Sequence, residues 1–218
     1  MDEILSVGQR IKKIRKDLDI KQEELAGNRF SKNYISMFEN DRRNINSINA
    51  TYLTKRINEL AKEKGVDFFI TNSYLLKTEK DLARDKCHEW LEEVEVGCDI
   101  TLEDIQKNLY KASKYSNKYK LFDLYARAQY LKGVNSLERK LFKCANTQFL
   151  EALQYFTKLD HNNSMFETYK SLAITLIEQK LYKQGLIYLD MAHGIVLKKP
   201  DNQFEKIKDI KYYKSLCV

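Results

Sequence analysis

Apolar residues in the N-terminal part of the chain recur at steps of three and four, which is the spacing of amphipathic helices. Val7, Ile11, Ile14 and Leu18 form one such face and predict a first helix. The same short, broken spacing continues to about Gly65. The pattern therefore predicts a group of small packed helices in this part of the chain.

Start and stop residues set the limits of the next helices. A brief second helix is expected over 22–26, because Gly27 follows it as a typical stop. Ser31 is a good N-cap for a third helix over 32–40. A closing helix, or a pair of helices, is expected over 48–61. Five short helices in all would make a compact domain.

The spacing of apolar residues changes after Gly65, where longer helices begin. We expect a domain over residues 1–68, a linker helix within 69–100, and a helical repeat domain over 101–218. The apolar residues of 74–95 predict one continuous helix in the linker. Later helices are expected over 102–116 and 204–216, the last one after a start at Pro200-Asp201.

An internal repeat organises the C-terminal part. LERKLFKCA at 137–145 is echoed by IEQKLYKQG at 177–185, a spacing of forty residues. In the first copy the small residue Gly133 precedes the aromatic Phe149, an arrangement that lets two antiparallel helices pack closely. This pattern is typical of tetratricopeptide-like hairpins, of which two to three are visible. A generic helical bundle is the alternative.

Composition supports an all-α fold and a nucleic-acid partner. Seven Gly and one Pro in 218 residues supply too few turns for a β-sandwich or barrel. Lys and Arg number 38 against 31 Asp and Glu, which leaves a net charge of +7. A basic chain suits DNA, although charges of both signs are abundant.

The chain shows no sign of secretion, membrane insertion or catalysis. The opening MDEILSVGQR is unlike a signal peptide, and no apolar run reaches the eighteen residues of a membrane span. We expect a soluble, cytoplasmic protein with reduced cysteines. Cys87, His88 and Cys98 lack a fourth ligand, so neither a metal nor another cofactor is expected. Nucleotide-binding and hydrolase motifs are missing, and an enzyme is not expected.

The segment VGQRIKKIRKDLDIKQEELAGNRFSKNYISMFENDRRN resembles the Cro/repressor-type (XRE-like) helix-turn-helix family. The resemblance covers nearly all of the first sixty-five residues. It implies a five-helix, lambda-repressor-like DNA-binding domain. The chain departs from the family at Lys21, where Ser or Thr usually caps the second helix, and at Asp41, where glycine is usual. Asp can still adopt a left-handed turn.

The third helix of this family enters the major groove, where its first turn and one face reach base edges. The base-reading candidates are therefore Lys32, Asn33, Ser36 and Met37. Lys donates to guanine acceptors, Asn pairs with adenine, and Met packs on a thymine methyl.

Other positions of the motif are expected to contact phosphate or to hold the domain together. The phosphate candidates are Gln22, Asn40, Arg42 and Arg43. The resemblance also implies a structural ion pair between Arg15 and Glu39, which ties the first helix to the end of the third.

A helix-turn-helix domain of this type joined to tetratricopeptide-like repeats resembles the peptide-pheromone-responsive RRNPP regulators of Gram-positive bacteria. The resemblance implies a dimer whose concave repeat face binds a short signalling peptide. Candidate contacts are Arg127, Tyr130, Asn135, Glu167 and Lys170. Relatives usually carry about five repeats, so the groove is shortened, the chain is truncated, or the repeats serve only dimerisation.

Two hypotheses of function follow. The first is a dimeric, sequence-specific regulator of transcription that binds a palindromic operator in double-stranded DNA. The second is an adaptor whose repeats bind a partner protein while the helix-turn-helix tethers it to DNA.

Overall fold

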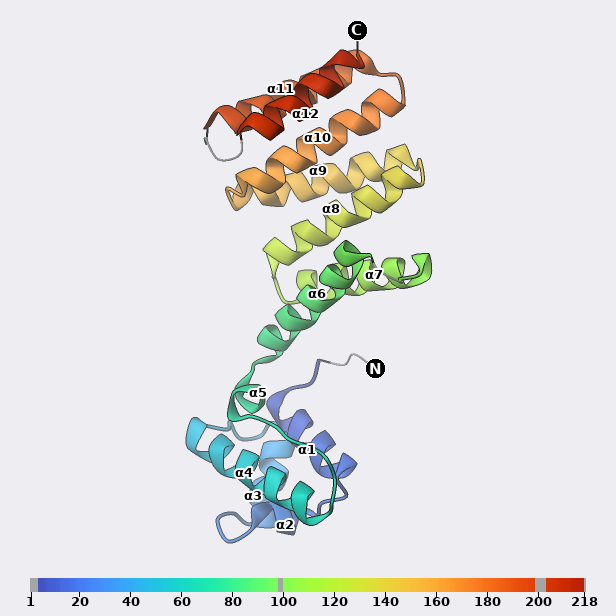
Figure 1. Ribbon diagram of the computed structural model, residues 1–218. Helices are drawn as coiled ribbons and strands as arrows, with labels where there is room; N and C mark the ends of the chain where they lie inside the picture. Colours follow the sequence, from blue (N-terminus) through green and yellow to red (C-terminus); the bar gives the residue numbers. More distant parts are fainter. Residues whose placement is uncertain (1–3, 98–99, 199–202, 218) are drawn as a thin grey trace. The chain divides into compact units, whose positions relative to one another are not determined.

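The described part of the chain is entirely helical. The computed structural model describes residues 4–97, 100–198 and 203–217, and every regular element in these ranges is an α-helix (Figure 1). This confirms the predicted all-α class. The chain divides into two compact units, Met1–Ala83 and Arg84–Val218. Each unit is described separately below.

The first unit packs five helices around one apolar core. They are α1 (Val7–Asp17), α2 (Gln22–Ala26), α3 (Lys32–Glu39), α4 (Ser47–Glu63) and α5 (Asn72–Leu76). N-cap side chains bond the first turns of α1, α3, α4 and α5, and Ser31 accepts from the Tyr34 amide at 3.2 Å as predicted. Ile11, Leu25, Ile35 and Phe38 are all completely buried in the shared core. The core therefore holds α3 between α1 and α2.

The fifth helix lies beyond the predicted domain boundary at residue 68. Residues 48–61 belong to the single helix α4, and α5 supplies the fifth helix. Leu75 of α5 is completely buried in the same core as Ile11. Because this side chain completes the core, the first unit extends to Ala83.

The helix predicted over 74–95 is wrong, because it is broken after α5. Arg10 is 3% exposed, and its guanidinium donates to the carbonyl oxygens of Leu75 at 2.9 Å and Lys77 at 2.5 Å. Burial lowers the pKa of this guanidinium. Thr78 and Asp81 then form a capping box that starts α6 (Glu79–Val96). The hydrogen bonds from Arg10 thus mark the end of α5, and the Thr78–Asp81 capping box begins α6.

The second unit repeats one helix length. After α6 come α7 (Leu102–Lys118), α8 (Phe122–Glu138), α9 (Phe142–Lys158), α10 (Asn162–Glu178), α11 (Tyr182–Lys198) and α12 (Gln203–Ser215). From α7 to α11 each helix has 17 residues and starts twenty after the one before. The predicted last helix corresponds to α12, and its expected start at Pro200-Asp201 lies outside the described residues.

The turns between these helices share one geometry. The residue after each C-cap has a positive φ, and these residues are Lys120, Lys140, Asp160 and Lys180. The next amide donates to a carbonyl five residues earlier, as from Leu141 to Ser136 at 2.8 Å, which is a Schellman motif. Repetition of this turn makes each helical hairpin forty residues long, as the internal repeat predicts. A tetratricopeptide repeat has 34 residues, so these helices are longer.

Close packing within the first hairpin depends on Gly133. In this unit α8 packs against α9 and α10 against α11, and consecutive helices stack side by side (Figure 1). A Cβ atom at Gly133 would lie 2.5 Å from the ring of Phe149, which is completely buried. The small residue therefore makes room for the aromatic ring, as the repeat pattern predicts.

Replacing Gly133 tests this packing. Gly133→Ala should lower the free energy of unfolding of the second unit by about 1 kcal/mol, because overpacking outweighs the gain in helix propensity. Gly194→Ala is the matched control in α11, where a Cβ meets no atom within 4 Å. It should raise the same free energy by roughly 1 kcal/mol. Urea denaturation followed through Trp90, the single tryptophan, measures both. Stabilisation by both substitutions would contradict the packing argument.

Candidate functional site

The predicted base-reading residues lie on the outer side of α3. Ile35 and Phe38 of this helix are completely buried, which turns the opposite side toward solvent. Lys32 and Asn33 are exposed in the first turn, and Met37 is 38% exposed one turn later. Ser36 is half-buried beside them. The side of α3 that faces water thus carries hydrogen-bond donors and acceptors that suit base edges, and an apolar side chain that suits a thymine methyl group.

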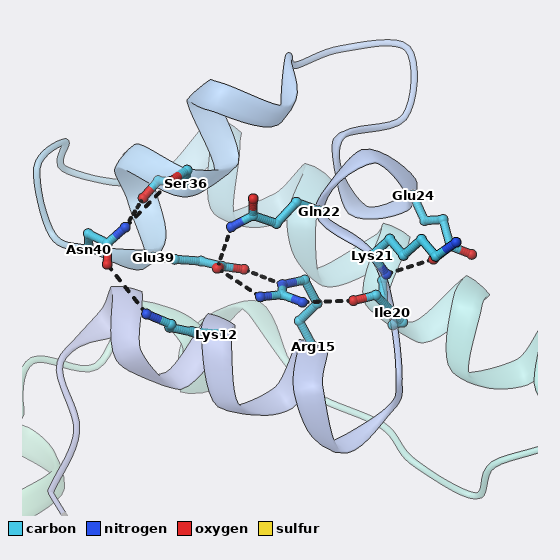
Figure 2. A network of polar contacts seen from close by, with 9 residues as sticks. All are labelled: Lys12, Arg15, Ile20, Lys21, Gln22, Glu24, Ser36, Glu39 and Asn40. Carbon is cyan, nitrogen blue, oxygen red and sulfur yellow. Dashed lines mark hydrogen bonds and ion pairs between the residues drawn. The ribbon is translucent and has the colours of Figure 1, made fainter.

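A buried ion pair supports α3 from behind (Figure 2). The Glu39 side chain is fully buried, and its carboxylate receives Arg15 Nε at 2.5 Å and Arg15 Nη2 at 3.0 Å. A third nitrogen of Arg15 donates to the Ile20 carbonyl at 2.9 Å. The hydrogen bond to Glu39 raises the pKa of Arg15. The pair therefore joins α1, the following turn and α3 by fixed, bidentate geometry.

Gln22 joins this network from the first turn of α2. Its amide nitrogen donates to Glu39 at 2.8 Å (Figure 2). The side chain is half-buried, so one of its two N–H groups is used inside the domain. Gln22 therefore has a structural contact, and its phosphate contact stays a prediction.

The end of α3 is tied to α1 by polar contacts. Asn40 donates to the Ser36 carbonyl at 2.8 Å, and its side-chain oxygen lies 3.4 Å from Lys12 Nζ (Figure 2). Asp41 adopts the left-handed turn, with a φ of 53°. Its carboxylate accepts from the Gly8 amide at 3.0 Å, which fixes the start of α1. The left-handed turn at Asp41 was predicted from the sequence, but its bond to Gly8 and the contact of Lys12 with Asn40 were not.

The two arginines after α3 differ in their surroundings. Both are exposed, and the Arg43 guanidinium lies over the Tyr34 ring at 4.3 Å from the centroid. Tyr34 in turn stacks on Phe30 at 5.1 Å. Arg43 is thus held near α3 by a cation–π contact, whereas Arg42 extends from the turn.

An ion pair that the sequence did not predict joins the first turns of α2 and α3. Lys32 Nζ lies 2.8 Å from Glu23 Oε1, and both side chains are more than half exposed. The hydrogen bond from Lys32 lowers the pKa of Glu23. The two charges are nine positions apart on different helices, so their contact depends on how the turn between α2 and α3 folds. A single sequence carries no local signal for it.

The second unit contains a cavity of about 380 Å³ lined by α6, α8, the end of α9 with the turn that follows it, and α10. Three of the five predicted peptide contacts line it, namely Arg127, Tyr130 and Glu167. The side chains of Leu124 and Phe156 form apolar parts of the cavity wall. Lys170 borders this group through its 2.9 Å ion pair with Glu167, and Asn135 is not part of the lining.

The cations at this cavity already have partners. Arg127 Nε donates to Glu95 at 2.8 Å, and Lys170 lies 3.1 Å from Asp209. Burial opposes the charge of Lys170, but the hydrogen bonds that it donates to Glu167 and Asp209 outweigh this effect and raise the pKa of Lys170. Burial also raises the pKa of Tyr130. The cavity therefore offers apolar surface and hydrogen bonds more readily than a free positive charge for a carboxylate.

Within the described ranges, no three His, Cys, Asp or Glu side chains are arranged to hold a metal ion. Cys98, which the sequence suggested with Cys87 and His88, lies outside these ranges. The described helices are also too short or too polar to cross a bilayer.

Sequence comparison finds no relative of this chain, and structural comparison finds a weak likeness. No protein-family model and no curated protein matches it. The crystal structure of Bacillus thuringiensis PlcR in complex with the peptide PapR7 and DNA is similar, with a TM-score of 0.39 and 14% identity over 97% of this chain and 86% of that chain.

Removing Glu39 tests the network behind α3. Glu39→Ala should lower the stability of the first unit by roughly 3–5 kcal/mol, because Arg15, whose side chain is only 14% exposed, keeps its charge without its partner. Hydrogen exchange of the α3 amides in the full chain measures the loss. Glu59→Ala is the control, since this carboxylate is 45% exposed and pairs at 3.7–3.9 Å. It should cost about 0–1 kcal/mol. Equal losses would show that the Arg15–Glu39 pair contributes no more than a surface pair.

Proposed function

We propose that this protein is a sequence-specific DNA-binding regulator of transcription that acts in the cytoplasm. One observation carries the proposal. The outer side of α3 presents Lys32, Asn33 and Met37 to solvent, while the Arg15–Glu39 pair fixes the helix from behind. Buried polar networks of this kind fix the geometry of a rigid reading surface.

The chemistry of this side of α3 suits the major groove. Lys32 would donate to guanine O6 or N7, and Asn33 would bond an adenine edge in bidentate fashion. Met37 would contact a thymine methyl group, with Ser36 beside it as donor or acceptor. Such contacts distinguish base pairs, which phosphate contacts do not.

Four residues around α3 would set its register on the duplex. Gln22 at the start of α2, and Asn40, Arg42 and Arg43 after α3, would contact phosphate oxygens. Gln22 keeps one N–H group for this role after its bond to Glu39. The cation–π contact holds the Arg43 guanidinium close to α3.

We further propose that two copies bind a palindromic operator. One α3 contacts only a few base pairs, and a symmetric homodimer places two such helices about one DNA turn apart.

The cavity of the second unit favours control by a ligand. A volume of about 380 Å³, with apolar walls and a polar edge, suits one or two apolar side chains of a short peptide. Arg127 would then donate, and Glu167 would accept, hydrogen bonds with the peptide backbone while both keep their own ion pairs. A signalling peptide of this kind would bias the regulator.

Capture of genomic DNA tests the regulator. At about 0.15 M salt the full chain should enrich a few fragments that share a palindrome, because base contacts add to the backbone term. Lys32→Ala/Asn33→Ala should lose this enrichment while keeping weak binding to all DNA. Uniform, salt-sensitive recovery by both proteins would instead favour the adaptor, whose helix-turn-helix only tethers a partner-binding repeat domain.

Filling the cavity tests ligand control. Heptapeptides with aromatic or aliphatic side chains should raise the Tm of the full chain, by a shift equivalent to about 2.7 kcal/mol at a hundredfold excess over Kd. Leu159→Trp, at the edge of the cavity, should abolish this shift. Leu150→Trp is the control, since Leu150 is similarly exposed and does not line the cavity. No shift with any peptide of a diverse set would overturn the peptide proposal.

A further inference from the structure

The pair between Glu23 and Lys32 has no evident structural purpose. Both side chains are nearly 60% exposed, and the Nζ–Oε1 distance is 2.8 Å. Exposed pairs of this kind contribute about 0–1 kcal/mol to stability, because water screens the charges and two long side chains lose freedom. The fold of the first unit therefore does not need the pair.

The other two carboxylates of α2 and α3 do have structural partners. Glu24 accepts from the Lys21 backbone amide at 2.6 Å and caps α2. Glu39 is buried against Arg15. Glu23 instead engages a side chain of the proposed base-reading surface. This placement suggests a role in DNA binding.

We propose that Glu23 is a positioning residue that makes Lys32 selective for base edges over phosphates. The inference rests on the proposed function. A lysine ammonium is a mobile point charge on a flexible stem, and it binds any phosphate within reach. Phosphates occur in every sequence, so a released Lys32 would strengthen binding to all DNA and lower selectivity.

Glu23 changes this balance in two ways. Its carboxylate holds the ammonium at the start of α3, which is the part of a recognition helix that meets base edges. It also repels the phosphate backbone, a cost that falls on every duplex. Lys32 has three N–H donors, so it can bond guanine O6 and N7 while it keeps its contact with Glu23, whereas a phosphate of the backbone requires it to leave the carboxylate. Selectivity results from the difference in free energy between these two contacts.

Binding of the full chain to two duplexes of equal length tests the inference. One duplex carries the palindrome enriched from genomic DNA, and the other carries a scrambled sequence. Glu23→Gln should bind the scrambled duplex roughly fivefold more tightly, and its salt slope should steepen by about one because one more phosphate is neutralised. Affinity for the palindrome should change less, so the ratio of the two affinities should fall about threefold or more.

Three further variants separate the possible causes: Lys32→Ala, the double variant Lys32→Ala/Glu23→Gln, and Glu63→Gln. In the Lys32→Ala background the change from Glu23 to Gln should have little remaining effect on the salt slope. Glu63→Gln removes the same charge from the exposed end of α4 and should leave the ratio unchanged. Thermal unfolding of Glu23→Gln should match the wild-type protein, since the pair is exposed.

The outcomes distinguish this inference from the function on which it rests. An unchanged ratio for Glu23→Gln, or the same change with and without Lys32, would overturn the role of Glu23 alone. A wild-type protein that binds both duplexes equally would overturn the regulator and this inference together.

Discussion

The first unit depends on a carboxylate that has no access to water. Glu39 is completely buried, and an isolated charge there would be very costly. It is tolerated because Arg15 of α1 and Gln22 of α2 both bond to it. Three helices from separate parts of the sequence must therefore assemble in one arrangement. That requirement fixes which side of α3 faces solvent, and so the DNA-binding surface proposed here follows from an interaction on its opposite side.

Much of the fold could be predicted because its signals are local. Ser31 and the apolar spacing define α3, and the forty-residue echo defines the hairpins. The break between α5 and α6 could not be predicted from apolar spacing, since Leu75 and Leu82 are compatible with one helix. It depends on Arg10, which is 65 positions from the Leu75 carbonyl that it binds. Only the Thr78–Asp81 capping box gave a local sign of the break.

The same limit applies to the candidate sites. Residue types and spacing place the proposed base-reading residues on one side of α3, as the helix geometry requires. Their partners come from other helices, so Glu23 was missed. Arg127 and Lys170 were expected to contact a peptide, but Glu95 and Asp209, which lie 32 and 39 positions away in the sequence, already pair with them. Spacing along one helix predicts neighbours on that helix, and charge neutralisation between helices needs the tertiary fold.

Charge pairing also bears on how strongly one copy could hold DNA. Near α3, Lys32 and Arg15 face carboxylates, and Arg43 lies against Tyr34. The net charge of +7 therefore overstates the positive charge that α3 offers to phosphates. A weak electrostatic term lowers binding to arbitrary sequences and leaves base contacts a larger share of the affinity. One helix-turn-helix of this kind would distinguish between DNA sequences well but bind DNA weakly on its own. Two linked copies on adjacent half-sites would bind more tightly and keep the same sequence selectivity.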